Sequence, residues 1–119
     1  MNLQLLSPIP GTLRNLADLT DPVFAQEIMG PGFAIIPDEV GTLNILAPTA
    51  GTLSHQLPHA CALTTADGFN ILIHAGIDTV LLKGEGFSAL HQLGQQVAAG
   101  EPLITWDLRP ARQAGYDRS

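Results

Sequence analysis

Cysteine, basic residues and aromatic residues are all scarce in this chain of 119 residues. A single cysteine, Cys61, cannot form an internal disulfide, which favours a reducing, cytoplasmic setting. No apolar run approaches the roughly 18 residues that a membrane-spanning helix needs. The N-terminal residues show neither the basic start nor the apolar core of a signal peptide. We therefore expect a cytoplasmic domain that does not insert directly into a membrane.

Positive charge is especially sparse: five Lys and Arg stand against eleven Asp and Glu, for a net charge of −6. This balance disfavours nucleic acid and anionic membrane surfaces as partners. No Lys or Arg occurs between Arg14 and Lys83, and three of the five lie in the last eleven positions. Phosphate sites normally use Lys, Arg or a metal ion. Any phosphate handled in the middle of this chain must therefore be held by backbone N–H groups, by imidazole or by a partner's arginine.

Apolar residues, glycine and proline are plentiful instead. Hydrophobic residues make up 45% of the chain and charged residues 13%, which is typical of a compact globular domain. The length fits one domain over residues 1–119 with one core. Twelve Gly and nine Pro between short apolar runs favour an all-β barrel or sandwich.

An internal repeat adds to this interpretation. LSPIPGTL (6–13) and LAPTAGTL (46–53) share the pattern L-[SA]-P-x-x-G-T-L, forty residues apart. Each copy indicates a strand end, a proline-initiated turn and a new strand after glycine. Two copies are too few for a solenoid. They fit a barrel with duplicated halves, with chance as the alternative because Pro-x-x-Gly is common in turns.

Short strands and two short helical turns are expected along the chain. Asp21 followed by Pro22 is a typical pair for a helix start, so a helical turn is predicted over 22–29. A weak helical turn is predicted near 110–115, and a hairpin turn at 66–68. The strands are expected at 11–16, 33–36, 43–46, 52–57, 60–65, 69–74 and 103–107.

Two of the four histidines, His59 and His74, fall at the open end of the predicted hairpin. They lie eight and seven residues from the turn centre at residue 67, hence almost opposite each other. Cross-strand partners have Cβ atoms about 4.5–5.5 Å apart. The other two, His55 and His91, are expected at exposed positions without a specific role.

A close pair of imidazoles fits three roles. The first is a structural hydrogen bond, and the second is a metal site, although two histidines are a weak signal for zinc. The third is nucleophilic catalysis, in which His74 attacks and His59 orients it or the transferred group. Gly76 would let backbone N–H groups face a phosphoryl oxygen, or is an ordinary turn glycine. Asp78 would accept a proton from imidazole, pair with a partner's arginine or cap the following turn.

The segment IHAGIDTVLLKGEGF (73–87), together with DPVFAQEIMGPGFAIIP (21–37), LAPTAGTL and LPHACAL (57–63), resembles the glucose-type enzyme IIA domain of the bacterial phosphoenolpyruvate–sugar phosphotransferase system. The resemblance implies an all-β barrel-sandwich hybrid with duplicated halves. It implies that His74 takes a phosphoryl group from the histidine phosphocarrier HPr and passes it to a cysteine of a IIB domain during sugar uptake. His59 would be the second active-site histidine. No cofactor is implied, though the two imidazoles can share zinc with a partner.

The resemblance also implies an apolar ring that docks HPr, the IIB domain and regulatory targets. A IIB partner would hold the domain at the membrane periphery. Here the ring would comprise Val23, Phe24, Ile28, Met29, Leu72 and Val80, with Gly76 and Asp78 supporting the phosphoryl group or the partner.

Two departures from the family pattern leave alternatives open. Leu57 stands where the family commonly has a threonine that hydrogen-bonds the phosphorylated histidine, and we expect the C-terminal strands to be missing after residue 119. A non-catalytic regulatory docking module is therefore the first alternative. A lysostaphin-type zinc peptidase is another, because His74 and Asp78 have its H-x-x-x-D spacing, but the downstream H-x-H is absent. A biotinyl or lipoyl carrier is disfavoured, since Lys83 lacks flanking methionines.

Overall fold

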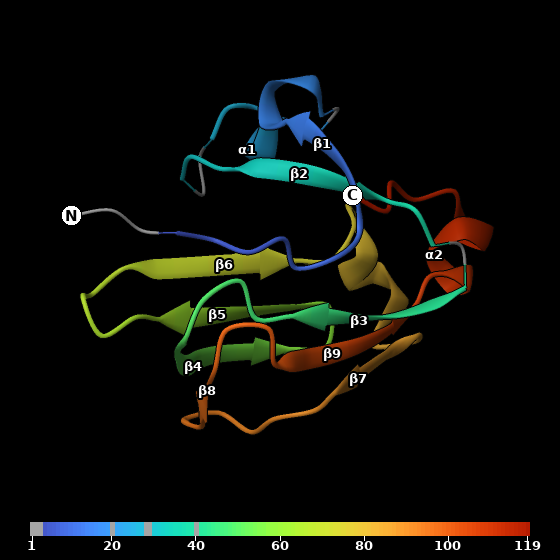
Figure 1. Cartoon of the computed structure of the whole chain (residues 1–119). Helices are drawn as coiled ribbons and strands as arrows, with labels where there is room; N and C mark the ends of the chain where they lie inside the picture. The colour runs from blue at the N-terminus through green and yellow to red at the C-terminus, as the bar shows by residue number, and fades with distance from the viewer. Residues whose placement is uncertain (1–3, 20, 28–29, 40) are drawn as a thin grey trace.

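A computed structural model describes residues 4–19, 21–27, 30–39 and 41–119, and confirms the all-β prediction (Figure 1). Seven strands were expected, and each is present with ends within one residue of the prediction. The elements in chain order are β1 (Gly11–Asn15), η1 (Leu16–Asp18), α1 (Pro22–Ala25), β2 (Phe33–Pro37), β3 (Thr42–Leu46), β4 (Gly51–Leu57), β5 (Ala60–Thr64), β6 (Asn70–His74), η2 (Thr79–Leu82), β7 (Phe87–Ala89), β8 (Gln96–Val97), β9 (Pro102–Asp107) and α2 (Arg109–Ala114).

The strands form three antiparallel sheets that do not close into a barrel within the described residues. A four-stranded sheet has the order β6-β5-β4-β8, and a three-stranded sheet has the order β3-β9-β7. The β1–β2 ribbon is separate and lies above them in Figure 1. The predicted all-β, sandwich-like architecture is therefore confirmed, and in the described residues the sheets stay open, with β6 at an edge of its sheet.

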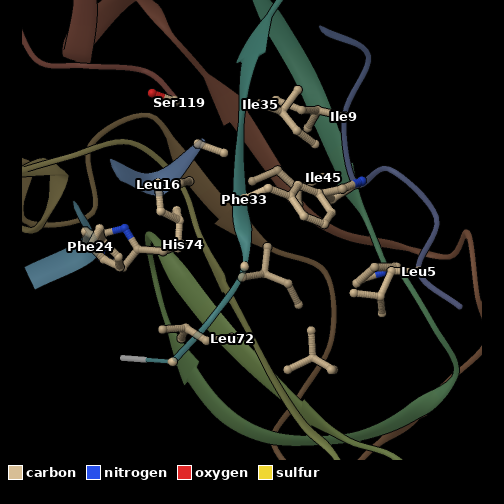
Figure 2. Close-up of a pocket in the computed structure, with 18 of the residues that line it drawn as sticks. Leu5, Ile9, Leu16, Phe24, Phe33, Ile35, Ile45, Leu72, His74 and Ser119 are labelled. Carbon is tan, nitrogen blue, oxygen red and sulfur yellow. The ribbon is translucent and has the colours of Figure 1, made fainter. Parts of the chain in front are cut away.

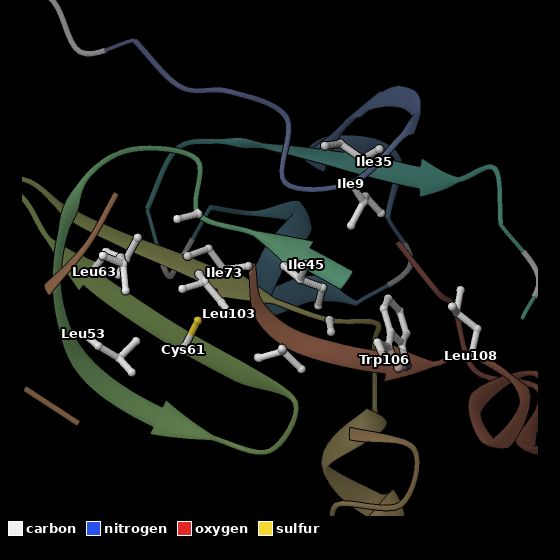
Figure 3. Close-up of a cluster of buried hydrophobic side chains, with 14 residues drawn as sticks. Ile9, Ile35, Ile45, Leu53, Cys61, Leu63, Ile73, Leu103, Trp106 and Leu108 are labelled. Carbon is white, nitrogen blue, oxygen red and sulfur yellow. The ribbon is translucent and has the colours of Figure 1, made fainter. Parts of the chain in front are cut away.

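The main hydrophobic core lies between the two larger sheets (Figure 3). Strand β9 contributes most strongly, because Leu103, Ile104 and Trp106 are at most 1% exposed. Burying one such side chain stabilises the fold by about 1.5–3 kcal/mol. The remaining members of this core are Ile9, Ile35, Ile45, Ala47, Leu53, Cys61, Leu63, Ile73, Ala75, Val97 and Leu108.

The two repeat copies contact each other through equivalent atoms. The N–H of Leu6 donates to the carbonyl of Pro48 at 2.8 Å, and the N–H of Leu46 donates to the carbonyl of Pro8 at 2.8 Å. Leu6 and Leu46 occupy the first position of the repeat, and Pro8 and Pro48 the third. Such a reciprocal pair of bonds is what a local two-fold relation between two halves produces, so the repeat is a structural one.

The repeat glycines also have the same role in both copies. Gly11 opens β1 and Gly51 opens β4. A Cβ atom at Gly11 would lie 2.1 Å from the carbonyl oxygen of Ile36, and one at Gly51 would lie 2.8 Å from that of Thr64. Both positions therefore need glycine because the neighbouring strand passes too close for a side chain.

The helical turns differ slightly from expectation. The carboxylate of Asp21 accepts the N–H of Val23 at 2.8 Å, as the predicted helix start requires. The helix α1 ends at Ala25, because Glu27 has a left-handed φ of 56°. Residues 28 and 29 lie outside the described residues. The second helix, α2, begins one residue earlier than predicted and is closed by Gly115 at φ 77°.

Within the described part of the chain, no helix has the length and hydropathy needed to cross a membrane.

Candidate active site

The β5–β6 hairpin places His59 and His74 next to each other, as predicted. Ala60 pairs with His74, and the carbonyl of His59 accepts the N–H of Ala75 at 2.8 Å. The two imidazole rings meet edge to face, with centroids 5.0 Å apart and planes at 80°. Side chains one register position apart in a ladder normally point to opposite faces. These two can meet because His59 precedes the first residue of β5.

The ring nitrogens of His74 have different environments. Nδ1 lies 2.8 Å from the carbonyl oxygen of Gly76. A carbonyl only accepts hydrogen bonds, so in the neutral ring Nδ1 carries the proton and Nε2 carries the free lone pair. His74 is half-exposed, whereas His59 is only 7% exposed. The geometry therefore presents Nε2 of His74 as a nucleophile.

Gly76 is required by the tight turn that follows β6. It has a left-handed φ of 76°, and a Cβ atom would lie 2.5 Å from Cγ2 of Thr79. The hydroxyl of the fully buried Thr79 donates to the carbonyl of Ala75 at 2.5 Å and holds the turn closed. The N–H groups of the two neighbouring residues already have partners. That of Ala75 donates to the carbonyl of His59, and that of Ile77 donates to the carbonyl of Asp117. The expectation that they would face a phosphoryl oxygen is therefore wrong.

Asp78 does not touch the imidazole. It is exposed, adopts a left-handed φ of 64° and precedes η2 without a side-chain capping bond. Nδ1 of His74 has the Gly76 carbonyl as its partner instead. The interpretation of Asp78 as proton acceptor is therefore wrong. Asp78 occupies the capping position of η2, but its side chain makes no capping bond, and pairing with a partner's arginine stays a prediction.

Burial favours the neutral form of both imidazoles. Desolvation lowers the pKa of His74, although the Gly76 hydrogen bond and the charge of Asp21 act in the opposite direction. Burial also lowers the pKa of His59, and the neighbouring His74 lowers it further. Sequence reasoning identified Asp21 only as a helix cap. No local pattern signalled this role, because the charge of Asp21 acts on His74 only through the packing of α1 against the end of β6.

An aromatic row connects the site to the core. The ring of Phe24 lies 4.9 Å from that of His74, at 56°. On the other side, Phe87 lies 6.4 Å from His59 and stacks on Trp106 at 5.6 Å. Phe87 lies in β7, a strand that the sequence did not predict. The row explains the dry surroundings that lower the histidine pKa values.

Two of the predicted docking residues, Phe24 and Leu72, lie with His74 in the lining of one apolar groove. This groove has a volume of about 470 Å³ and runs along β6 (Figure 2). Val23, Leu72 and Val80 are 39%, 41% and 60% exposed, respectively. Leu57 and Leu81 are exposed apolar side chains too, and neither was among the predicted docking residues. The predictions for Ile28 and Met29 fall outside the described residues.

The remaining histidines lie elsewhere. His55 is exposed on β4, as expected. His91 is only half-exposed, so its expected exposed position is wrong, and its Nε2 lies 2.8 Å from a carboxylate oxygen of Glu101. Among the described residues, no three or more His, Cys, Asp or Glu side chains are grouped so that they could hold a metal ion.

Fold and site together define a β-sandwich domain with a pair of adjoining imidazoles, one of them partly exposed beside an apolar groove. The family model for the EIIA 1 component of the phosphoenolpyruvate-dependent sugar phosphotransferase system matches residues 3–119, and the chain belongs to this family.

Curated relatives and a solved structure agree with this membership. The chain is 41% identical, over 93% of its length, to the beta-glucoside-specific EIIBCA component of Bacillus subtilis, of which it covers 18%. It is 38% identical, over 90% of its length, to the glucose-specific EIIA component of Staphylococcus epidermidis, of which it covers 64%. Glucose permease IIA from Mycoplasma capricolum superposes with a TM-score of 0.89 at 37% identity, covering 98% of this chain and 75% of that one. The chain thus spans less than two thirds of these curated relatives.

Proposed function

We propose that this chain is a phosphocarrier of the sugar phosphotransferase system and that His74 carries the phosphoryl group. The observation that supports this most directly is the His74–Gly76 contact, which leaves Nε2 as the free nucleophile in a member of this family. The Nε2 lone pair attacks phosphorus on the phosphohistidine of HPr. The new N–P bond forms as the donor's N–P bond breaks, and the donor imidazole leaves with the electron pair.

The second transfer reverses the role of His74. A cysteine thiolate of a IIB domain attacks the phosphoryl group, so an S–P bond forms while the N–P bond of His74 breaks. The family members from Bacillus subtilis and Streptococcus pneumoniae named EIIBCA and EIICBA carry B and C portions together with an A portion, which supports a IIB partner. A partner of this kind would place the domain at the cytoplasmic side of the membrane.

His59 acts as the helper in this proposal. Its ring meets that of His74 edge to face, and burial keeps it neutral. A neutral imidazole offers one N–H, which can donate to a phosphoryl oxygen held on His74. The scarcity of nearby Lys and Arg then has a reason, because the partner supplies the positive charge. Asp21 and the exposed Asp78 flank the site and would pair with that charge.

Leu57 favours keeping a non-catalytic docking module as the second candidate. The register Leu57–Ala60–His74 places residue 57 in the same cross-strand row as His74, with only a small alanine between them. A threonine there would present a hydroxyl to that row, and leucine presents none. Leu57→Thr tests this point: faster transfer or a longer-lived phosphohistidine would show that Leu57 weakens the carrier.

Zinc is not required for this chemistry. His59 and His74 supply two ligands, so a shared site would need further ligands from a partner. A zinc peptidase needs three protein ligands, and the described residues provide no such group.

The test is phosphorylation by phosphoenolpyruvate, enzyme I and HPr, followed by intact-mass and tandem mass spectrometry. We expect one acid-labile phosphoryl group on His74, lost in His74→Ala and still accepted in His59→Ala. His55→Ala is the matched control, since this exposed histidine lies away from the site. A folded protein that accepts no phosphoryl group, or a His74→Ala variant that still does, would overturn the proposal.

A further inference from the structure

We propose that Arg14 and Asp117 are positioning residues for His74, acting through the peptide group between Gly76 and Ile77. The inference rests on the proposed phosphocarrier function for its effect on rate. Its structural content, the fixed tautomer of His74, does not depend on that function.

One peptide group is held from both sides. Its carbonyl, that of Gly76, accepts the hydrogen bond from Nδ1 of His74 at 2.8 Å. Its N–H, that of Ile77, donates to the carbonyl of Asp117 at 2.8 Å. In a trans peptide the C=O and N–H point in opposite directions. The Asp117 carbonyl and the His74 ring therefore fix the same peptide plane from opposite sides. Hydrogen bonds in such a chain also polarise one another.

The C-terminal segment makes a second bond to the same turn. The carbonyl of Ser119 accepts the N–H of Gly76 at 2.8 Å. Residues 117–119 therefore lie alongside residues 76–77, just beyond the end of β6. The side chain of Ile77 packs with Leu19 and Ala34 in a small core cluster, and this packing also fixes the turn.

The side chain of Asp117 holds this segment in place. Its Oδ1 accepts the N–H of Ser119 at 2.9 Å and also the Ser119 hydroxyl. Its Oδ2 accepts from Nη1 of Arg14 at 3.3 Å. Burial alone would raise the pKa of Asp117, but the Ser119 hydrogen bonds and the charge of Arg14 together lower it. The carboxylate is therefore charged at neutral pH.

Arg14 connects the segment to the β1–β2 ribbon. Its Nη2 donates to the carbonyl of Asp18 at 2.8 Å, while Nη1 reaches Asp117. The guanidinium thus spans from η1 to the C-terminal segment, and both side chains of the pair are less than a third exposed, at 28% and 27%. This is the only arginine in the first half of the chain. Its place in the fold is explained by this contact rather than by phosphate binding.

The experiment reads the His74 tautomer without any phosphoryl donor. Imidazole ¹⁵N shifts of His74 are measured across pH in the wild type, Arg14→Gln, Arg14→Lys and Asp117→Ala. Arg112→Gln is the matched control, because within the described residues this guanidinium has no side-chain partner. We expect one Nδ1–H tautomer in the wild type and the control, and a mixture in Arg14→Gln and Asp117→Ala. Arg14→Lys should recover most of the wild-type signature.

The second readout is the rate of phosphoryl acceptance from phosphorylated HPr. Loss of orientation should lower kcat roughly ten- to hundredfold while KM changes little, because neither residue belongs to the apolar docking surface. Circular dichroism verifies that each variant is folded at the temperature used. Unchanged ¹⁵N shifts in folded Arg14→Gln would overturn the inference. An unphosphorylated wild type with a shifted tautomer in the variants would overturn the proposed function alone.

Discussion

Nδ1 of His74 lies 2.8 Å from the carbonyl oxygen of Gly76, and this contact gives the two ring nitrogens different roles. One nitrogen is used to hold the ring, so the other is free to react. Burial also favours the neutral ring, so under the proposed function His74 would not have to lose a proton before it attacks at neutral pH.

The first prediction concerns the pH dependence of phosphoryl acceptance. The pKa of His74 is lowered by desolvation, so its neutral form persists below the ordinary imidazole value of about 6.5. We expect the rate to stay constant as pH falls to about 6.5 and to decline only below it. Rapid-quench measurements with phosphorylated HPr check this. An inflection at or above the ordinary value would contradict it.

The second prediction concerns stability. Because the pKa values of His59 and His74 are lowered in the folded state, the unfolded chain binds more protons in the range below about pH 6.5. The free energy of unfolding is therefore highest above that pH and falls as pH drops through the folded-state pKa values. Urea unfolding between about pH 5 and 8 measures the slope. His59→Gln should flatten it, whereas His55→Gln, at an exposed position, should leave it unchanged.

The third prediction is that Phe24→Ala raises the pKa of His74. The Phe24 ring lies 4.9 Å from the imidazole and keeps water from one side of it. Removing the ring reduces the desolvation that lowers this pKa, so the value should move toward about 6.5. An NMR titration of His74 tests this. Phe69→Ala, in the hairpin turn at the other end of β6, is the control and should not shift it.

The fourth prediction tests the repeat glycines. Gly51→Ala would bring a Cβ atom to 2.8 Å from the Thr64 carbonyl, and backbone cannot move aside cheaply. We expect the free energy of unfolding to drop by about 2 kcal/mol or more. At Gly32 the nearest atom would be Cδ1 of Leu16 at 3.8 Å. Gly32→Ala should therefore change stability by less than about 0.5 kcal/mol, and equal effects of the two substitutions would refute the steric argument.

The site hairpin was predictable because its signals are local. The turn at 66–68 and the apolar runs on each side set the register, and counting from residue 67 places His59 and His74 almost opposite each other, as observed. The repeat at 6–13 and 46–53 also predicted two similar halves, and reciprocal hydrogen bonds connect its two copies in the structure. The strands β7 and β8 were missed because three and two residues are too short to show an alternating pattern.

Other parts of the site depend on contacts between distant segments. Arg14 and Asp117 are 103 residues apart, and no local pattern links them. The same holds for the bond from the Ile77 N–H to the Asp117 carbonyl, which occupies a donor that was expected to face a phosphoryl oxygen. The charge of Asp21 acts on His74 only because α1 folds over the end of β6.

The reciprocal bonds between the two repeat copies also bear on the order of events during synthesis. At ribosomal rates of about 5–20 residues per second, the forty residues that separate Leu6 from Leu46 take about 2–8 seconds to emerge. Until then the carbonyl of Pro8 lacks its partner Leu46, and the N–H of Leu6 lacks its partner Pro48. The contacts between residues 6–8 and the second repeat copy therefore form only after residue 48 has emerged, although β1 can already pair with β2 by then. A ribosome paused before residue 46 would leave these two hydrogen bonds unmade.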